Sequence, residues 1–500
     1  MGIDSGTNAC KVVLFDLNGR PISASSREHP IHYPKPTWAE QNPEWWWLAA
    51  AEAVRDTLKK CSIDPGDVCG VGVDSQREAV VLIDEDGRSI SNSIIWLDRR
   101  TIPQAEEIRG ILSQEVVLSK TGVPIDYVYS AARLRWLMKE APNLLMKTKR
   151  ILFPKDYIVY RLTGEAATDY SMASRTMLFN IHKLGWDDEI CEILGIPVEP
   201  LPPVRGAWEV VGEVSVDAAK ATGLKPGTPI VSGGGDRPCE ALGANVVDPG
   251  RINIGTGTAT AMTTPLERPR IDKEGKVDCC CHVVPDRWEY ELAILTTGAS
   301  FRWFRDNFAH EEVELSRKFG GNAYDYLVEL ASKIPPGSDS LFYYPYPMGA
   351  KAPKFNELAR AVLFGLALSH SKAHFVRAIM EGVGFQYAET LELLARLKLK
   401  PVEASMVGGE AKSELWNQMK ADIIGLKIWV PEVADAAALG SAILAGVGAG
   451  VYKTVKDGAE RTVRFKKAYN PNFEANRVYQ EILDKYKRIY EHLEEGYTLI

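Results

Sequence analysis

The 500-residue sequence lacks several features that would mark particular classes of protein. It has no apolar run long enough to cross a bilayer and no basic region followed by an apolar stretch near residue 1, so we expect no membrane partner and no signal peptide. It has no basic block, and its formal net charge is -7, so we expect no nucleic acid partner. Its 8 cysteines include no C-x-x-C pair, which is typical of a reducing cytoplasm.

One cysteine-rich run could be taken for a metal site. Cys279, Cys280 and Cys281 are followed directly by His282. Successive side chains of a strand point to opposite faces, so these neighbours cannot all reach one ion. We therefore expect a strand here, with a structural role for His282.

What is present indicates a large α/β protein. The chain is 45% hydrophobic and 25% charged, as in ordinary globular proteins, and is long enough for two or more domains. A helix is predicted from Pro43, and after further predicted strands come helical stretches near 102–112, 130–140 and 155–162. Strands followed by helices favour an α/β fold. We expect domains at 1–226 and 227–455, followed by a helical tail at 456–500.

The chain is organised around a glycine-rich stretch near its middle. An apolar run at 228–231 leads into Gly233, Gly234 and Gly235, then into Asp236 and a predicted helix. Glycines permit close approach of the backbone to another molecule, and a carboxylate at the end of a strand is well placed to accept a proton. The alternative is that Asp236 only caps the helix.

Two Gly-Thr turns suggest phosphate binding. The first follows a short strand at residues 2–4, and the second is Gly255-Thr256-Gly257-Thr258 in a predicted hairpin at 253–263. Backbone N–H groups and hydroxyls in such turns can cradle phosphate oxygens. The chain begins almost inside its first strand, so we expect that strand to have little support and the loop at Asp4 to be mobile.

Polar residues that end predicted strands are candidates for ligand contacts, because α/β proteins bind ligands there. Arg77 and Glu78 follow a buried strand at 70–74, although they could form a solvated turn. Trp96 precedes a charged cluster, although it could belong to the core. Arg99 and Arg100 are adjacent, so at most one should point inward, and we choose Arg99.

Taken together, the sequence resembles the FGGY carbohydrate kinases over nearly its whole length. The likeness lies in the first phosphate motif, the second phosphate motif, a run typical of the family and the adenosine motif, at 2–7, 233–258, 361–381 and 407–416 respectively. So many matches in the same order make a chance resemblance improbable.

The resemblance implies an α/β fold of two ribonuclease-H-like domains of the actin and hexokinase type, with an ATP cleft between them. It implies ATP and Mg²⁺ as cofactors, Asp236 as the general base, and Asp4 with Asp236 at the metal. We expect the nucleotide to be contacted by Asp4, Gly6, Thr7, Lys11, Gly255, Thr256, Gly257, Thr258, Gly408, Gly409 and Ser413. We expect the substrate to be contacted by Arg77, Glu78, Trp96, Arg99, Asp236 and Arg237.

The resemblance leaves the substrate open. The Gln76-Arg77-Glu78 run resembles glycerol kinase and the autoinducer-2 kinases, whereas Lys155-Asp156-Tyr157 and the triple glycine resemble xylulokinase. Our first hypothesis is phosphorylation of a small sugar or polyol, above all a pentulose such as D-xylulose, by a homodimer. The alternatives are glycerol or autoinducer-2 phosphorylation and, from another class, an actin-fold ATPase without a small substrate.

Departures from the family pattern bear on these expectations. Arg237 replaces an amide after the base, and we expect its charge to keep Asp236 ionised. Val128 stands where glycerol kinase has an aromatic contact, which weakens the glycerol hypothesis. Glu410 follows the glycine pair where relatives have a small residue, which leaves the contacts to adenosine open.

Overall fold

The computed structural model describes residues 1–499 as an α/β protein of two compact units. Unit 1 comprises Met1–Pro249, Pro265–Tyr290 and Asp435–Arg464; unit 2 comprises 250–264, 291–434 and the chain from residue 465 onward. The boundary expected at 226/227 lies inside unit 1, so Asp236 belongs to the N-terminal unit. The reason is that β15 (Gly234–Gly235) pairs with β5 (Gly72–Ser75) in the sheet of unit 1.

The main sheet of unit 1 has the strand order β15-β5-β1-β2-β3. Strand β1 (Gly2–Ser5) pairs antiparallel with β2 (Ala9–Phe15) and parallel with β5, so it is bonded on both sides over its whole length. The expectation that this strand has little support is therefore wrong. The outer strand β3 (Pro21–Glu28) follows a turn at Asn18-Gly19, a pair of residues typical of hairpins.

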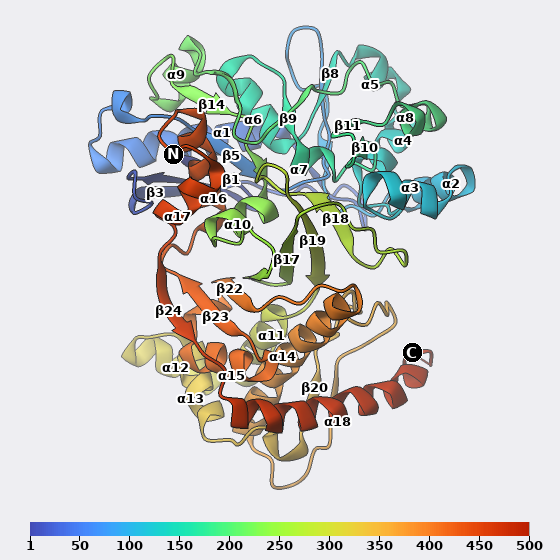
Figure 1. Ribbon diagram of the computed structural model, residues 1–500, viewed down its shortest axis with the longest axis vertical. Helices are drawn as coiled ribbons and strands as arrows, with labels where there is room; N and C mark the ends of the chain where they lie inside the picture. The colour runs from blue at the N-terminus through green and yellow to red at the C-terminus, as the bar shows by residue number, and fades with distance from the viewer. Residues whose placement is uncertain (500) are drawn as a thin grey trace. The chain divides into compact units, whose positions relative to one another are not determined.

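Helix α16 (Ala436–Gly448) packs directly on this sheet although it is distant from β1 in the chain (Figure 1). A Cβ added to Gly72 would lie only 2.1 Å from the carbonyl oxygen of Ser441, so glycine permits this close approach. The same helix contacts α10 (Asp236–Gly243). Residues 435–464 therefore complete unit 1.

The remaining elements of unit 1 form the rest of its core and its cover. Helix α1 (Pro43–Cys61) begins at the cap Asn42 and buries Trp46 and Trp47 in the core. The other helices are α2 (Ile102–Ile111), α3 (Gln114–Thr121), α4 (Ser130–Glu140), α5 (Pro142–Lys147), α6 (Pro154–Thr163), α7 (Tyr170–Ala173), α8 (Asp188–Leu194), α9 (Val216–Thr222) and α17 (Val455–Thr462). The smaller strands are β4 (Glu40–Gln41), β6 (Val81–Ile83), β7 (Ser93–Ile94), β8 (Arg150–Leu152), β9 (Thr168–Asp169), β10 (Phe179–Asn180), β11 (Gly185–Trp186), β12 (Val204–Arg205), β13 (Val210–Glu213) and β14 (Pro229–Val231).

The cysteine-rich run forms strand β18 (Asp278–Cys281), as predicted, and its three cysteines are buried. His282 is buried as well, and its Nδ1 accepts a hydrogen bond of 3.1 Å from the N–H of Val284. Within residues 1–499, no three His, Cys, Asp or Glu side chains form a set of metal ligands.

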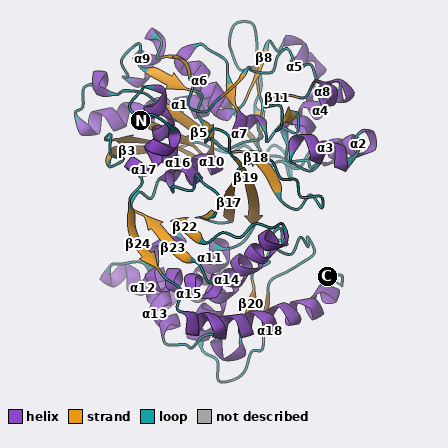
Figure 2. Cartoon of the chain, in the orientation of Figure 1, coloured by secondary structure: helices purple, strands orange, loops and turns teal. Residues whose placement is uncertain are grey.

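The strands of unit 2 follow the order β19-β17-β16-β22-β23-β24 within a 7-stranded sheet, and β20 and β21 form a separate pair. Its strands are β16 (Arg251–Thr256), β17 (Thr260–Leu266), β19 (Trp288–Ile294), β20 (Phe342–Tyr344), β21 (Val362–Phe364), β22 (Glu403–Gly408), β23 (Lys427–Pro431) and β24 (Phe465–Tyr469). Its helices are α11 (Gly298–Phe308), α12 (His310–Phe319), α13 (Ala323–Ser332), α14 (Lys372–Arg396), α15 (Glu414–Ile424) and α18 (Phe473–Tyr497), of which α18 stands out by its length in Figure 2. The predicted hairpin at 253–263 is confirmed by the antiparallel pairing of β16 with β17.

Candidate active site

Three carboxylates lie at the ends of adjacent strands in unit 1. Asp4 is directly opposite Asp74 in the parallel pair of β1 and β5. Gly234 is opposite Asp74 on the other side, and Asp236 follows two residues later. The sheet therefore delivers one acid from each of β1, β5 and the β15–α10 turn to a single edge, where α/β proteins bind ligands.

Burial, together with this crowding, raises the pKa of two of the acids. Burial raises the pKa of Asp4 to about 7, and neighbouring carboxylates, chiefly that of Asp236, add to the shift. Burial and the nearby Asp4 raise the pKa of Asp74 well above its usual range, while the Ser441 hydroxyl, which donates a 2.5 Å bond to it, works against the shift. The cluster thus favours binding of a proton or a cation.

The three glycines serve the packing of unit 1 itself. Gly233 has a φ of +74°, and a Cβ there would lie 1.9 Å from the carbonyl oxygen of Val73. A Cβ on Gly235 would lie 2.5 Å from Cδ of Arg77. The glycines therefore bring β15 against β5 and let the Arg77 side chain cross the turn, whereas the sequence led us to expect an approach to another molecule.

Asp236 is the first residue of α10, and the residue in the capping position is Gly235. The Oδ1 of Asp236 accepts a 2.8 Å bond from the N–H of Arg237, so it satisfies one donor of the first helical turn. Its side chain remains 32% exposed, which leaves the carboxylate accessible to a ligand.

A buried charged network holds this turn in place. Lys155 contacts Asp169 at 3.3 Å and donates a 2.9 Å bond to the carbonyl oxygen of Ser232. Asp169 accepts a 2.5 Å bond from the hydroxyl of Ser171, which in turn accepts the N–H of Gly235 at 2.9 Å. The network fixes the backbone on both sides of the triple glycine.

Arg77 brings positive charge to Asp236. Its side chain is buried, and its Nε lies 3.5 Å from Asp236 Oδ1. Arg237, which we expected to supply this charge, has its Nη1 3.9 Å from Oε1 of Glu240. The structure therefore adds a guanidinium beside the candidate base that comes from a residue distant in sequence.

Glu78 is held in a constrained conformation next to Arg77 in the chain. Its φ is +68°, which is uncommon for a residue with a side chain and concentrates at functional sites. Its carboxylate accepts a 2.7 Å bond from Nε of Arg175, and its carbonyl oxygen accepts a 2.9 Å bond from the hydroxyl of Ser130. Both Arg77 and Glu78 are buried, so the alternative of a solvated turn is wrong.

The aromatic and basic residues after β7 divide into exposed and buried positions. Trp96 is 42% exposed and donates a 2.9 Å bond from Nε1 to the hydroxyl of Thr7, so it is not a core residue. Arg100 is the arginine that points inward, where it pairs with Asp98 at 2.6 Å. Arg99 is exposed, so our choice of Arg99 as the inward residue is wrong.

The first phosphate motif lies beside the acid cluster. Lys11 is opposite Asp4 in the β1–β2 register and forms an ion pair with Asp435. Gly6 and Thr7 are half-buried in the turn between these strands. The motif is thus accessible, although Lys11 already has an acidic partner.

In unit 2 the second phosphate motif meets the adenosine motif. Thr256 is opposite Gly408 at the ends of β16 and β22, and a Cβ on Gly408 would lie 1.9 Å from the carbonyl oxygen of Thr256. A Cβ on Gly409 would meet nothing within 4 Å, so this backbone is open. Gly257 and Thr258 are exposed at the tip of the hairpin.

Two hydroxyls of the expected nucleotide site are used within the protein. The buried Thr256 hydroxyl donates a 2.6 Å bond to the carbonyl oxygen of Val407. The Ser413 hydroxyl caps α15 by accepting the N–H of Trp416 at 3.3 Å. These side chains position the turns, which leaves the exposed backbone and Thr258 for a ligand.

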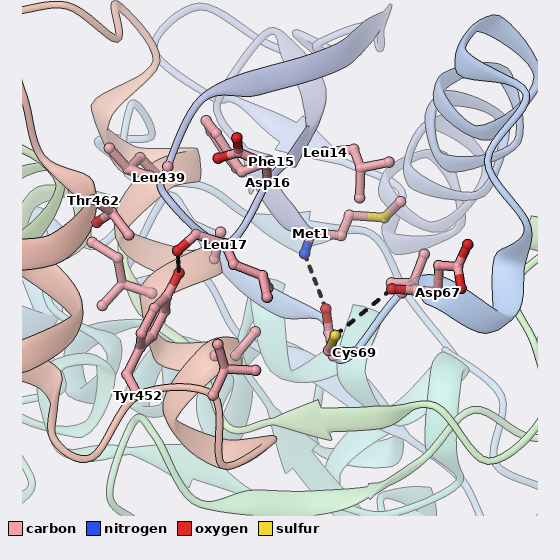
Figure 3. Close-up of a pocket in the computed structure, with 18 residues that line it drawn as sticks. Met1, Leu14, Phe15, Asp16, Leu17, Asp67, Cys69, Leu439, Tyr452 and Thr462 are labelled. Atoms are coloured by element: carbon pink, nitrogen blue, oxygen red, sulfur yellow. Dashed lines mark hydrogen bonds between the residues drawn. The ribbon is translucent and has the colours of Figure 1, made fainter.

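A cavity of about 60 Å³ lies elsewhere in unit 1 (Figure 3). It is lined by Met1, Cys69 and Tyr452 among others, and Tyr452 donates a 3.1 Å bond to the carbonyl oxygen of Leu17. Met1 precedes β1, so this cavity lies at the strand's amino end, away from Asp4. It is not part of the candidate site.

Sequence reasoning missed several residues that shape the site. Asp74 was treated only as the end of a buried strand, although its polar side chain after an apolar run was a signal. Arg175, Ser441 and Asp435 lie far from the glycine motifs in sequence, and nothing in their spacing indicates that folding brings them to the acid cluster or to Glu78.

Comparison with known proteins identifies the class. Residues 1–243 match the N-terminal domain, and residues 250–449 the C-terminal domain, of the FGGY family of carbohydrate kinases. The chain is 31% identical to a Bacillus subtilis xylulose kinase, over 100% of this chain and 98% of that protein. It is also 31% identical to a B. subtilis gluconokinase, over 100% and 97%.

A solved structure gives the same result. Ligand-bound xylulose kinase from Lactobacillus acidophilus superposes with a TM-score of 0.90 at 26% identity, covering 99% of this chain and 98% of that one. The protein belongs to the FGGY family of carbohydrate kinases, which use ATP. It is thus an enzyme, and the alternative of an ATPase without a small substrate is set aside. Among residues 1–499, no helix is both long and apolar enough to cross a membrane.

Proposed function

We propose that this kinase phosphorylates a hydroxyl of a pentulose such as D-xylulose, with Asp236 as the general base. The observation that carries the proposal is the placement of Asp236, an accessible carboxylate on the first residue of α10 whose Oδ1 is 3.5 Å from a buried guanidinium. The relatives named xylulose kinase support the choice of sugar.

The residues of unit 1 divide the work of the reaction. Asp236 accepts the proton of the attacking hydroxyl, and Arg77 beside it favours the ionised form of the carboxylate. Arg77 and Glu78 grip substrate hydroxyls, since a guanidinium fork and a carboxylate suit a vicinal diol. Arg175 and the Ser130 hydroxyl hold Glu78 in position for this contact.

The acid cluster fits Mg²⁺. Asp4 and Asp236 would hold the ion, because its positive charge would offset the repulsion between these neighbouring carboxylates at a buried position. Mg²⁺ keeps several waters and uses only one or two carboxylates, so it does not require three convergent protein ligands. When bound, the ion supplies positive charge that neutralises phosphate oxygens.

We place the nucleotide at the open backbone of unit 2. The accessible members of its two glycine motifs are Gly257, Thr258 and Gly409. The turns that carry them are shaped by Gly255, Thr256, Gly408 and Ser413. A second accessible phosphate turn, in unit 1, comprises Gly6, Thr7 and Lys11.

The expected homodimer remains a prediction that light scattering tests.

A second set of substrates has specific support. Gln76-Arg77-Glu78 resembles the run in glycerol kinase and the autoinducer-2 kinases, and relatives with these names and with the name gluconokinase are 30–31% identical to the chain. The substrate is therefore tested as a panel: D-xylulose, other ketoses, gluconate, glycerol and autoinducer-2, each assayed for ADP release. We expect the highest kcat/KM for D-xylulose. A higher value for another compound would transfer the proposal to that substrate, and release that needs no added compound would refute it.

A further inference from the structure

A buried carboxylate lies among the glycine-rich turns of unit 2. Glu410 begins the short 3-10 helix η3 (Glu410–Lys412), which connects β22 to α15, and its side chain is 4% exposed. Its Oε2 accepts a 2.6 Å bond from Nζ of Lys420 and a 3.0 Å bond from the hydroxyl of Tyr387. One oxygen of the carboxylate is therefore fully engaged.

The other oxygen is buried and free. Oε1 of Glu410 has no hydrogen-bond partner anywhere in residues 1–499. A buried carboxylate oxygen without a donor carries a desolvation cost that a ligand would remove. Such an atom in a site built for another molecule indicates where that molecule binds.

The free oxygen faces bare backbone at the start of α11. A Cβ added to Gly298 would lie 3.8 Å from Oε1 and 2.2 Å from the carbonyl oxygen of Gly257. The N–H of Glu410 donates a 3.2 Å bond to the hydroxyl of Thr256. Oε1 therefore lies where both glycine motifs of the proposed nucleotide site converge.

The orientation of the carboxylate is fixed from behind. Lys420 is completely buried, with Nζ 3.6 Å from Sδ of Met406 and 4.1 Å from the ring centroid of Trp416. An ammonium group only donates hydrogen bonds, so it holds an acceptor of Glu410 against it. The Tyr387 hydroxyl is fixed in turn by a 2.9 Å contact with another hydroxyl, that of a threonine in β17. Oε1 is thereby aimed away from these partners.

We propose that Glu410 determines nucleotide selectivity by accepting, at Oε1, a hydrogen bond from a donor of the nucleoside. The donor is a ribose hydroxyl or an N–H of the base, since a carboxylate oxygen pairs with either. The inference rests on the proposed placement of the nucleotide in unit 2. It gives a function to the residue that departs from the family pattern.

Calorimetric titration with nucleotide and no sugar tests the proposal. We titrate ADP, 2′-deoxy-ADP, 3′-deoxy-ADP and IDP, which lack in turn each ribose hydroxyl and the amino group of adenine. We expect one analogue to bind about 10-fold or more weakly than ADP, as loss of a hydrogen bond to a charged group predicts, and that analogue identifies the donor.

The variant Glu410→Gln replaces the hydrogen-bond acceptor at Oε1 with a donor. Its amide oxygen must face Lys420, which only donates, so its NH₂ group replaces Oε1 and turns an acceptor into a donor. We expect this variant to bind ADP about as weakly as the discriminated analogue and to lose the preference. Tyr387→Phe is the matched control, because it removes a donor from Oε2 and leaves Oε1 in place, so it should keep the preference.

Two results would overturn the inference. One is equal binding of all four nucleotides by the parent protein; the other is an unchanged preference in a Glu410→Gln variant that thermal unfolding shows to be folded. Absence of any ADP binding by the parent would instead overturn the placement of the nucleotide, and the inference with it. The titration thus separates failure of this inference from failure of the proposed function.

Discussion

The acid cluster of unit 1 and the buried glutamates of unit 2 are arranged in opposite ways. In unit 1, the buried Asp74 lies next to Asp4, and the groups that raise its pKa include other carboxylates. In unit 2, Glu381 pairs with Arg377 at 2.7 Å, and Glu410 pairs with a buried lysine at 2.6 Å. Carboxylates that face one another indicate a site that binds a cation or a proton. Carboxylates that are paired with a basic side chain indicate a structural role, and only a carboxylate oxygen without a hydrogen-bond partner is available for a ligand.

The largest effect expected from this contrast between the units is at Asp236, in the acid cluster of unit 1. Asp236→Asn keeps the shape of the side chain and removes the base, so we expect kcat to fall about 10²–10⁴-fold. The affinity for ATP, measured without Mg²⁺ because Asp236 is also a proposed holder of the ion, should change little. Kinetics with the best sugar of the panel and calorimetry with ATP measure the two quantities. If Asp236 only stabilised the first turn of α10, the variant would keep most of the parental kcat, because Asn serves that role as well.

Two variants test this contrast between the units through the free energy of unfolding. One breaks an ion pair in unit 2, and the other removes a carboxylate from the acid cluster of unit 1. Arg377→Met leaves Glu381 buried without its cation, so we expect a loss of about 3–5 kcal/mol in the free energy of unfolding. Asp74→Asn removes a carboxyl group that faces another carboxyl group, so we expect a change within about 1 kcal/mol. Urea unfolding of both variants measures the difference, and equal losses would contradict the contrast between the units.

The sequence predicts well those features that depend on local pattern. Helix α4 runs from Ser130 to Glu140 as predicted, and the glycine-rich turns lie at the strand ends expected for them. The residues that surround them could not be predicted, because long-range packing selects them. Ser441 reaches Asp74 only because residues 435–464 return to unit 1, and Arg100 turns inward only because a buried aspartate lies beside it.

We expect acid to lower the stability of unit 1, because the buried His282 resists protonation in the folded protein. Burial lowers the pKa of His282 to about 3, and the positive charge of Arg287 adds to the shift, even though Oε2 of Glu289 lies 3.7 Å from its Nε2. The unfolded chain therefore binds a proton between about pH 6.5 and 3 that the folded protein does not, so the stability present above about pH 6.5 is lost as the pH falls. At about pH 4.5 we expect a loss of about 2–3 kcal/mol from this residue.

Two acids of unit 2 respond in the opposite sense. Burial raises the pKa of Glu381 and of Glu389, so their contribution to stability is lost as the pH rises and not as it falls. As the pH is lowered to about 4.5, the protection of backbone amides against hydrogen exchange should therefore fall in β18 before it falls in α14. His282→Gln is the control, since it removes the titrating ring. A parental pH dependence retained in this variant would exclude His282 as the cause.

The smallest expected effect concerns how unit 1 grips its substrate. Arg77 and Glu78 are buried at a strand end, and Arg175 holds Glu78 from behind at 2.7 Å. Changing Arg77 or Glu78 to Ala leaves a substrate hydroxyl unpaired, at a cost of about 1–3 kcal/mol, which corresponds to a KM about 5–150-fold higher. Because Glu78 is neither the base nor the ionic partner of the base, kcat of the Glu78 variant should fall far less than in Asp236→Asn. Arg99→Ala is the matched control, as this arginine is exposed and its neighbour takes the inward position, so its KM should stay near the parental value. If the Arg77 and Glu78 variants keep the parental KM while Arg99→Ala raises it, the substrate contact lies after β7 and not after β5.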